Sequence, residues 1–190
     1  MKRRSNIFVV AVAFGLGGAI ATLAWLASGY PSDALLSNGR PTWSEVTWPF
    51  APDEWGKGKA FRCKASDCGT EINLFVRAKI GFCNCTTGIA DDADLDRMGD
   101  LDLVGGQVGA LGDGRPISVG HMQGRIRGYT LTPRNPLAKT AISAAFNDRC
   151  DMVVATVVLP HGRPATIEPA VIEFLNGNTV MRWAEVTLGL

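Results

Sequence analysis

The chain has 190 residues, of which 46% are hydrophobic and 19% charged, and its formal net charge is +1. This composition is typical of a folded protein, and the length allows an export segment followed by one domain of about 150 residues. Without the three basic residues at positions 2–4, 16 basic residues face 18 acidic ones, and so nearly neutral a domain gives no electrostatic basis for binding nucleic acid.

The first predicted element is a membrane-spanning helix. Ile7 to Ala27 is an uncharged run of 21 residues, close to the roughly 20 residues that a helix needs to cross a bilayer. A cleavable signal has a shorter apolar core of about 7–15 residues, so the run favours an uncleaved anchor; cleavage near Ala27-Ser28-Gly29 is the alternative. Basic residues before the run and Asp33 after it orient the N-terminus toward the cytosol. We therefore expect a single-pass protein of a bacterial inner membrane with a periplasmic domain. A membrane of the eukaryotic secretory pathway is the alternative.

Four parts follow from this topology. They are a cytosolic basic N-terminus at 1–6, the transmembrane helix at 7–29, a tether at 30–58 that packs partly on the domain, and an extracytoplasmic domain at 59–190. The tether contains Trp43, Trp48 and Trp55. Tryptophans so close together are typical of a partner-binding surface, and also of large rings that cover a core. These three residues are the partner-binding candidates.

The clearest strand pattern lies at 72–80. Apolar residues occupy every second position from Ile72 to Ile80. Because strand side chains alternate between the two faces of a sheet, this predicts one face in a core and the other, with Arg77 and Lys79, in water.

Five cysteines in an exported chain predict two structural disulfides and one remaining thiol. Cys83 and Cys85 lie two positions apart on the same extended segment, where a bond between them would be strained. We favour at least one bridge from the Cys63/Cys68 pair to the Cys83/Cys85 pair or to Cys150. Such a bridge would stabilise the fold by about 3 kcal/mol in the chain-entropy model.

Short elements are expected through the rest of the chain. A helix with a solvated acidic start, capped by Asp92, should run to about Met98, and the glycines from Gly105 to Gly114 should form turns. A second helix should start at Glu168-Pro169 and end at Asn176-Gly177. The segment 179–190 fits a helix or a strand. Strands are expected at 117–121, 125–132, 141–146 and 151–159.

Two details of these strands are predicted as well. Gln123-Gly124 is expected to form a hairpin turn, and the β-branched run at 151–159 should be buried on both faces. Because strands and helices do not alternate strictly, the fold class is α+β. We expect an antiparallel or mixed sheet of about five strands with one to three helices packed on it.

Three kinds of chemistry match single features of the sequence. Four thiolates from Cys63, Cys68, Cys83 and Cys85 would suit zinc, although neither pair has the usual C-x2-C spacing. The same cysteines could exchange disulfides, although the C-x-x-C motif at a helix start is missing. Copper could instead take Cys83, Cys85, His121 and Met122.

Hydrolysis would require a site built around His121 or His161. The sequence has no G-x-S-x-G elbow before a helix. By elimination, the sequence predicts a non-catalytic, membrane-anchored extracytoplasmic binding module without a cofactor, an accessory or assembly subunit of a membrane protein complex. Its contacts would be the membrane, through Ile7 to Ala27, and a protein partner. The alternative is an exported zinc- or copper-binding or thiol-redox protein that uses the four-cysteine cluster.

Overall fold

The computed structural model describes residues 41–81, 87–132 and 140–190. All of these residues belong to the compact unit that begins at Leu35. The predicted membrane-spanning segment at 7–29 and the first part of the tether lie outside the described residues. Within the described ranges, no helix combines the length and the apolar character that crossing a membrane requires.

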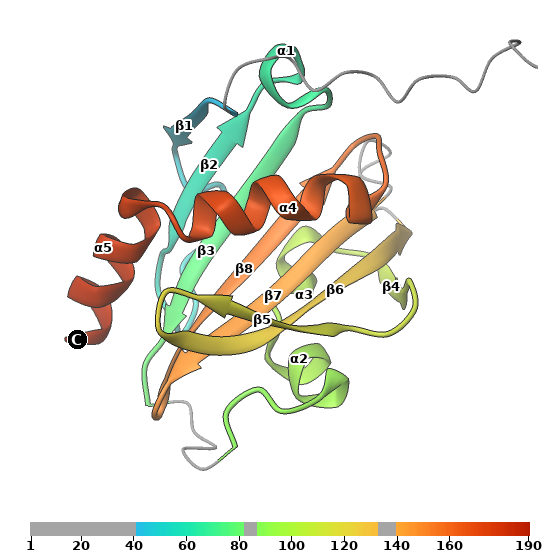
Figure 1. Cartoon of the computed structure of the whole chain (residues 1–190). Helices are drawn as coiled ribbons and strands as arrows, with labels where there is room; N and C mark the ends of the chain where they lie inside the picture. The colour runs from blue at the N-terminus through green and yellow to red at the C-terminus, as the bar shows by residue number, and fades with distance from the viewer. Residues whose placement is uncertain (1–40, 82–86, 133–139) are drawn as a thin grey trace, which may run out of the picture. The chain divides into compact units, whose positions relative to one another are not determined.

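Eight strands form one sheet in which all paired strands are antiparallel (Figure 1). The order is β1-β2-β3-β8-β7-β6-β4, and β5 also pairs with β6. The strands are β1 (Trp43–Val46), β2 (Lys59–Cys63), β3 (Ile72–Lys79), β4 (Gln107–Ala110), β5 (Arg115–Val119), β6 (Met122–Thr132), β7 (Thr140–Asp148) and β8 (Asp151–Leu159). The α+β prediction with an antiparallel sheet is confirmed. The expected number of about five strands was too low, because β1, β2 and β4 are too short to show a clear alternation.

Among the described residues, five helices accompany the sheet, and four of them divide between its two faces (Figure 1). α4 contacts β6 and β7, α5 contacts β3 and β8, and α2 contacts β6 and β7 from the other side. The helices are α1 (Ala65–Cys68), α2 (Asp92–Met98), α3 (Leu101–Val104), α4 (Pro164–Leu175) and α5 (Asn178–Leu188). We call the side covered by α4 and α5 the helix face, and the side covered by α2 and α3 the charged face.

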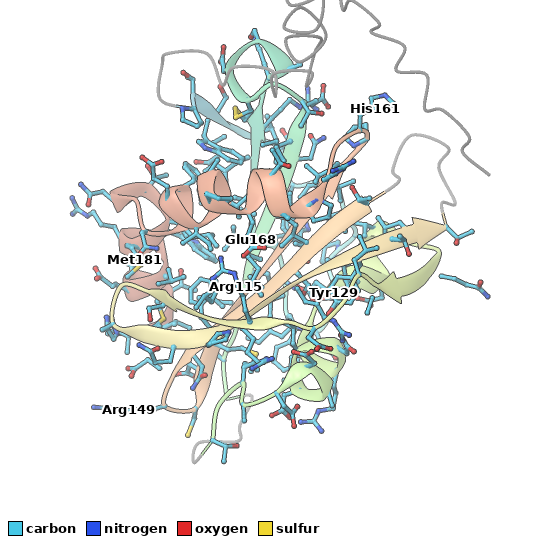
Figure 2. All side chains as sticks on the ribbon, turned by 45° about the vertical axis from the view of Figure 1, so that its right-hand side comes forward. Arg115, Tyr129, Arg149, His161, Glu168 and Met181 are labelled. Carbon is cyan, nitrogen blue, oxygen red and sulfur yellow. A yellow bond between two sulfur atoms is a disulfide. The ribbon has the colours of Figure 1, made fainter. Side chains whose placement is uncertain are left out.

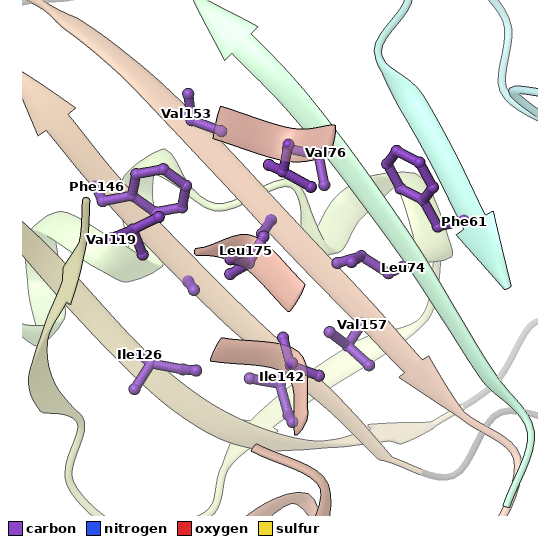
Figure 3. Packing of buried hydrophobic residues seen from close by; sticks show 14 of the residues in the cluster. Phe61, Leu74, Val76, Val119, Ile126, Ile142, Phe146, Val153, Val157 and Leu175 are labelled. Carbon is purple, nitrogen blue, oxygen red and sulfur yellow. The ribbon is translucent and has the colours of Figure 1, made fainter. Parts of the chain in front are cut away.

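The main hydrophobic core lies on the helix face. Alternate side chains of the central strands meet the inner side chains of α4 and α5, and Leu175 lies over the sheet close to Ile142 and Val157 (Figure 3). All three side chains are at most 1% exposed. Each such burial stabilises the fold by about 1.5–3 kcal/mol, so this face fixes the packing of the domain.

β8 is buried on both faces, as the unbroken β-branched run predicts. Val153 and Val157 belong to the main core on the helix face. Met152 and Val154 pack with Leu95 of α2 on the charged face. The strand therefore forms the centre of a three-layer structure.

β3 departs from its predicted orientation toward water. Leu74 and Val76 are buried on the helix face, as expected, but Arg77 and Lys79 on the other face are only 3% and 7% exposed. Ile80, which was expected in the core, lies beyond the end of the strand and is 58% exposed. The prediction of a solvated second face was wrong, because α3 and the segment before β2 cover it.

The hairpin between β5 and β6 turns earlier than predicted. Val119 pairs with Met122, so Gly120 and His121 form the turn, and Gly120 has a positive φ of 58°. Gly124, which was expected in the turn, lies within β6. A Cβ atom there would be 2.0 Å from the carbonyl oxygen of Ala145, so the glycine allows close strand approach rather than a turn.

The C-terminal helices differ from prediction at one boundary. α4 begins at Pro164, not at Glu168-Pro169, and Pro169 lies inside the helix. Asn176 ends α4, as predicted. The segment that fitted either a helix or a strand is α5, which buries Val180, Ala184 and Leu188 at a spacing of four.

Candidate functional site: a cleft on the charged face

A cleft of about 650 Å³ opens on the charged face. It extends from the segment before β2, past the connection between α2 and α3, to β4. From β3 to β6 the sheet spans three strand spacings, about 14 Å. The side chains that give the cleft its chemistry are Asp53, Glu54, Trp55, Arg77, Lys79, Asp96, Arg97, Asp100, Asp102, Val108 and Tyr129.

Asp100 organises one end of the cleft floor. Its two carboxylate oxygens accept hydrogen bonds from Nε and Nη2 of Arg77 at 2.9 and 2.5 Å. The ammonium group of Lys79 lies 2.8 Å from the same carboxylate and donates to the carbonyl oxygen of Met98. The side chains of Arg77, Lys79 and Asp100 are at most 8% exposed. This buried cluster attaches the start of α3 to β3.

Asp53 completes the cluster from the segment before β2. Arg77 donates through Nη1 to Asp53 at 2.5 Å. Burial lowers the pKa of Arg77, but the hydrogen bonds to Asp100 and Asp53 more than offset this effect, so its pKa lies above the ordinary value. The hydrogen bond from Arg77 lowers the pKa of the Asp53 carboxyl group. Two cations therefore face two carboxylates, and the cluster is neutral as a whole.

A second set of ion pairs holds α2 to β6. Arg125 binds Asp92 at 2.6 Å, and Arg127 binds Asp96 at 3.2 Å. Asp96 also accepts a hydrogen bond from the hydroxyl group of Tyr129. Burial, followed by this hydrogen bond, raises the pKa of Tyr129. The phenol therefore acts as a hydrogen-bond donor at neutral pH.

The predicted helix is confirmed from Asp92 to Met98. Its acidic start is solvated only in part, because Asp91 is exposed whereas Asp92 is half-buried against Arg125. The N-cap is Asp91, whose side chain accepts from the backbone N–H of Asp94. The side chain of Asp92 instead forms an ion pair with Arg125. The glycine-rich stretch expected as turns also contains β4, which lines the cleft.

The sequence carried a signal for this arrangement. Asp92, Asp96 and Asp100 recur at a spacing of four, and each binds a basic residue of the sheet. Those basic residues stand two apart on their strands, at 77 and 79 and at 125 and 127. A spacing of four places Asp92 and Asp96 along one side of α2, and Asp100 follows at the start of α3. A spacing of two places side chains on one face of a strand.

The three tryptophans of the predicted tether do not share one surface. Trp43 stacks on Phe174 of α4 on the helix face, with ring centroids 4.5 Å apart. Trp48 makes an edge contact with Phe75, which points to the charged face. Trp55 lines the cleft, and the Lys79 ammonium lies 5.5 Å from its ring centroid. Of the three partner-binding candidates, the structure places only Trp55 at the cleft.

The cysteine pairing differs from the favoured one. Cys63 and Cys68 bond to each other, with 6.1 Å between their Cα atoms, and the bond closes the turn that contains α1. Neither can therefore bridge to the Cys83/Cys85 pair or to Cys150. Cys150 is also disulfide-bonded, and Cys83 and Cys85 lie outside the described residues.

Those predicted metal and hydrolase residues that the structure describes lie apart from the cleft. Because Cys63 and Cys68 share a disulfide, they offer no pair of thiolates to zinc. His121 lies in the β5–β6 turn, while Met122 beside it is buried in the main core. His161 lies in the loop after β8, and Figure 2 shows it well away from Tyr129. In the described part of the chain, no three His, Cys, Asp or Glu residues gather as a metal site would require.

This arrangement favours binding over reaction. The buried groups of the floor hydrogen-bond to one another, so the charges that a ligand would meet are those at the rim. Glu54 and Asp102 are exposed, and the side chain of Asp96 is 47% exposed. The cleft thus combines a neutral, tightly bonded floor with acidic groups at its opening.

No family model and no curated protein sequence matches the chain. Among solved structures, cyanobacterial PsbP (CyanoP) from Synechocystis is similar, with 12% sequence identity and a TM-score of 0.41. The similarity covers 76% of this chain and 95% of that chain.

Proposed function

We propose that the chain is a non-catalytic binding module, anchored in the bacterial inner membrane by residues 7–29, whose periplasmic domain binds a protein partner. In this role it serves as an accessory or assembly subunit of a membrane protein complex. The observation that carries the proposal is the cleft on the charged face. Its preformed shape and its exposed rim suit recognition of another molecule.

The chemistry of the cleft floor supports binding rather than catalysis. A general base or nucleophile must be able to exchange a proton with a substrate. Here the carboxylate of Asp100 is shared between two buried cations, and the phenol of Tyr129 donates to Asp96. These groups stabilise the fold, and the pKa of Tyr129 is raised away from neutrality.

The disulfide supports the proposed compartment. Disulfides persist in oxidising compartments such as the periplasm and are rare in the bacterial cytosol. The bond between Cys63 and Cys68, together with the uncharged run at 7–27, supports a domain outside the cytosol. The bond also rules out the four-thiolate zinc site, because that site requires both of these cysteines as thiolates.

Photo-crosslinking in intact membranes tests the proposal. A photoreactive amino acid replaces Ala110 at the cleft or, as a control, Glu173 on the exposed side of α4. We expect discrete crosslinked products from position 110, and none of the same size from position 173. Identical patterns from both positions, or none from either, would contradict a partner-binding role for this face.

A fusion reporter tests the topology separately. Alkaline phosphatase fused after Leu190 should be active if the domain is periplasmic, because that enzyme requires disulfides. A cytosolic fluorescent reporter at the same position should then be dark. Activity of the cytosolic reporter alone would contradict the proposed orientation.

A further inference from the structure

We propose that the cleft binds an extended, basic segment of the partner protein, with its Lys or Arg side chains against Glu54, Asp96 and Asp102. This inference rests on the proposed function, and it names the chemistry of the partner surface. It follows from the charges, the shape and the position of the cleft.

The accessible charge of the cleft is negative. Arg77 and Lys79 are neutralised by Asp100 and Asp53, so the floor presents no net charge. At the rim, Asp96 is paired with Arg127 and the cation Arg97 is paired with Asp94, so Glu54 and Asp102 give the opening an excess of negative charge. Opposite charge on a partner guides its approach and fixes its orientation. A basic segment therefore complements this cleft, and an acidic one is repelled.

The shape of the cleft fits an extended chain. The acidic residues lie along its length: Glu54 stands near β3, Asp102 in α3, and Asp96 near Tyr129 of β6. Three strand spacings together measure about 14 Å, which is the length of about four residues of extended chain. A single small cation would fill only a fraction of the 650 Å³. Several basic side chains on one segment would use the whole cleft.

The end of the cleft at β4 is open and carries an apolar side chain. β4 is the last strand in the order of the sheet, and all four of its residues are exposed. Val108 lines the cleft with 40% of its surface exposed. A partner segment can therefore enter beside β4 and place an apolar side chain on Val108 between its basic residues.

The test measures binding of two labelled peptides to the full chain in mild detergent. One eight-residue peptide alternates lysine with serine, and the other alternates glutamate with serine. Fluorescence anisotropy at low ionic strength should show binding of the lysine peptide only. Raising the salt should weaken this binding, because exposed charges are screened beyond about 10 Å at 0.1 M ionic strength.

A matched pair of variants locates the binding. Glu54→Gln/Asp102→Asn removes two cleft carboxylates, and Glu71→Gln/Glu173→Gln removes two exposed carboxylates elsewhere. Both variants change the net charge equally. We expect the first to weaken lysine-peptide binding about fivefold, and the second by less than twofold. Equal losses in the two variants, no binding of the lysine peptide, or equal binding of both peptides would overturn the inference.

The same variants separate this inference from the proposed function. Crosslinking from position 110 is repeated in the Glu54→Gln/Asp102→Asn background. Reduced crosslinking, together with weaker peptide binding, supports the basic segment. Unchanged crosslinking overturns the basic segment while the partner-binding function stands. If the unsubstituted protein gives no crosslink, the proposed function itself fails.

Discussion

The two faces of the sheet are covered in physically different ways. On the helix face, α4 and α5 pack through apolar side chains such as Val171, Leu175 and Val180. On the charged face, α2 and α3 bury smaller apolar clusters around Leu95 and Leu101. They are also held by ion pairs from Asp92, Asp96 and Asp100 to the sheet. Hydrophobic burial does not depend on direction, whereas hydrogen-bonded ion pairs fix the position of each partner.

This difference indicates a division of roles. The helix face supplies most of the stability, because it buries the larger continuous core. The charged face determines where α2, α3 and the Asp53 segment lie, and therefore determines the shape of the cleft. Substitutions on the two faces should therefore cause losses of folding stability that differ in magnitude. The losses should also differ in whether a second substitution restores the stability and in how they depend on pH.

The largest effect is expected at Asp100. Asp100→Ala leaves Arg77 buried with only Asp53 as a carboxylate partner, and leaves Lys79 without its ion pair. Removal of one partner from a buried ion pair typically costs about 3–5 kcal/mol. Chemical unfolding followed by tryptophan fluorescence should show a loss of stability in this range.

A compensating variant distinguishes charge imbalance from lost packing. Arg77→Met/Lys79→Met/Asp100→Leu removes the two cations and the carboxylate between them, and it should recover most of the stability. The cleft of this variant should nevertheless lose its defined shape. Weaker binding of the lysine peptide would reveal this loss. If the triple variant is as unstable as Asp100→Ala, charge imbalance is not the cause.

The helix face should lose stability without a change in the cleft. Leu175 is completely buried in the main core, and Leu175→Ala leaves a cavity that costs about 3 kcal/mol. Because no charge changes, the loss should be the same at pH 5 and pH 8. Peptide binding should be retained in the folded fraction. A loss of binding there would mean that the two faces are coupled.

The disulfide at the edge of the helix face should contribute less. Cys63 and Cys68 are only five positions apart, and closing so short a loop stabilises by about 2 kcal/mol in the chain-entropy model. Cys63→Ala/Cys68→Ala should lower the free energy of unfolding by this amount. Peptide mapping of the unreduced, unsubstituted protein by mass spectrometry should locate the bond between Cys63 and Cys68. Free thiols at both positions would refute the pairing.

The apolar layers and α2 could be predicted from the sequence, whereas the burial of Arg77 and Lys79 on the charged face was not. The run at 151–159 specifies a strand buried on both faces, because no alternation points to water. The same logic failed for Arg77 and Lys79, since alternating basic residues usually indicate a solvated face. Their partners Asp53 and Asp100 lie 24 and 23 residues from Arg77, and only the fold brings them together. The prediction of the disulfide pairing failed for the same reason. The sequence is compatible with several pairings, and only the fold determines which cysteines meet.

The smallest effect, and the one most specific to the charged face, is expected at Asp92. The backbone N–H of Gly114 and then the Arg125 side chain hold the pKa of Asp92 below its usual range. A depressed pKa in the folded state contributes stability above the unfolded pKa of about 3.9, and this contribution is lost as the pH falls through the folded value. Asp92→Asn should therefore cost about 1 kcal/mol at pH 7.

The pH dependence of this loss separates Asp92 from the helix face. As the pH falls below about 3.9, the carboxyl group of the unfolded chain becomes protonated before that of the folded protein, so the difference between Asp92→Asn and the original protein should shrink. Leu175→Ala should show no such convergence. Glu173→Gln, an exposed change on α4, serves as the control for altered net charge. Urea unfolding at pH 3 and pH 7 measures all three, and a constant loss for Asp92→Asn would show that the ion pair with Arg125 does not stabilise α2 on the sheet.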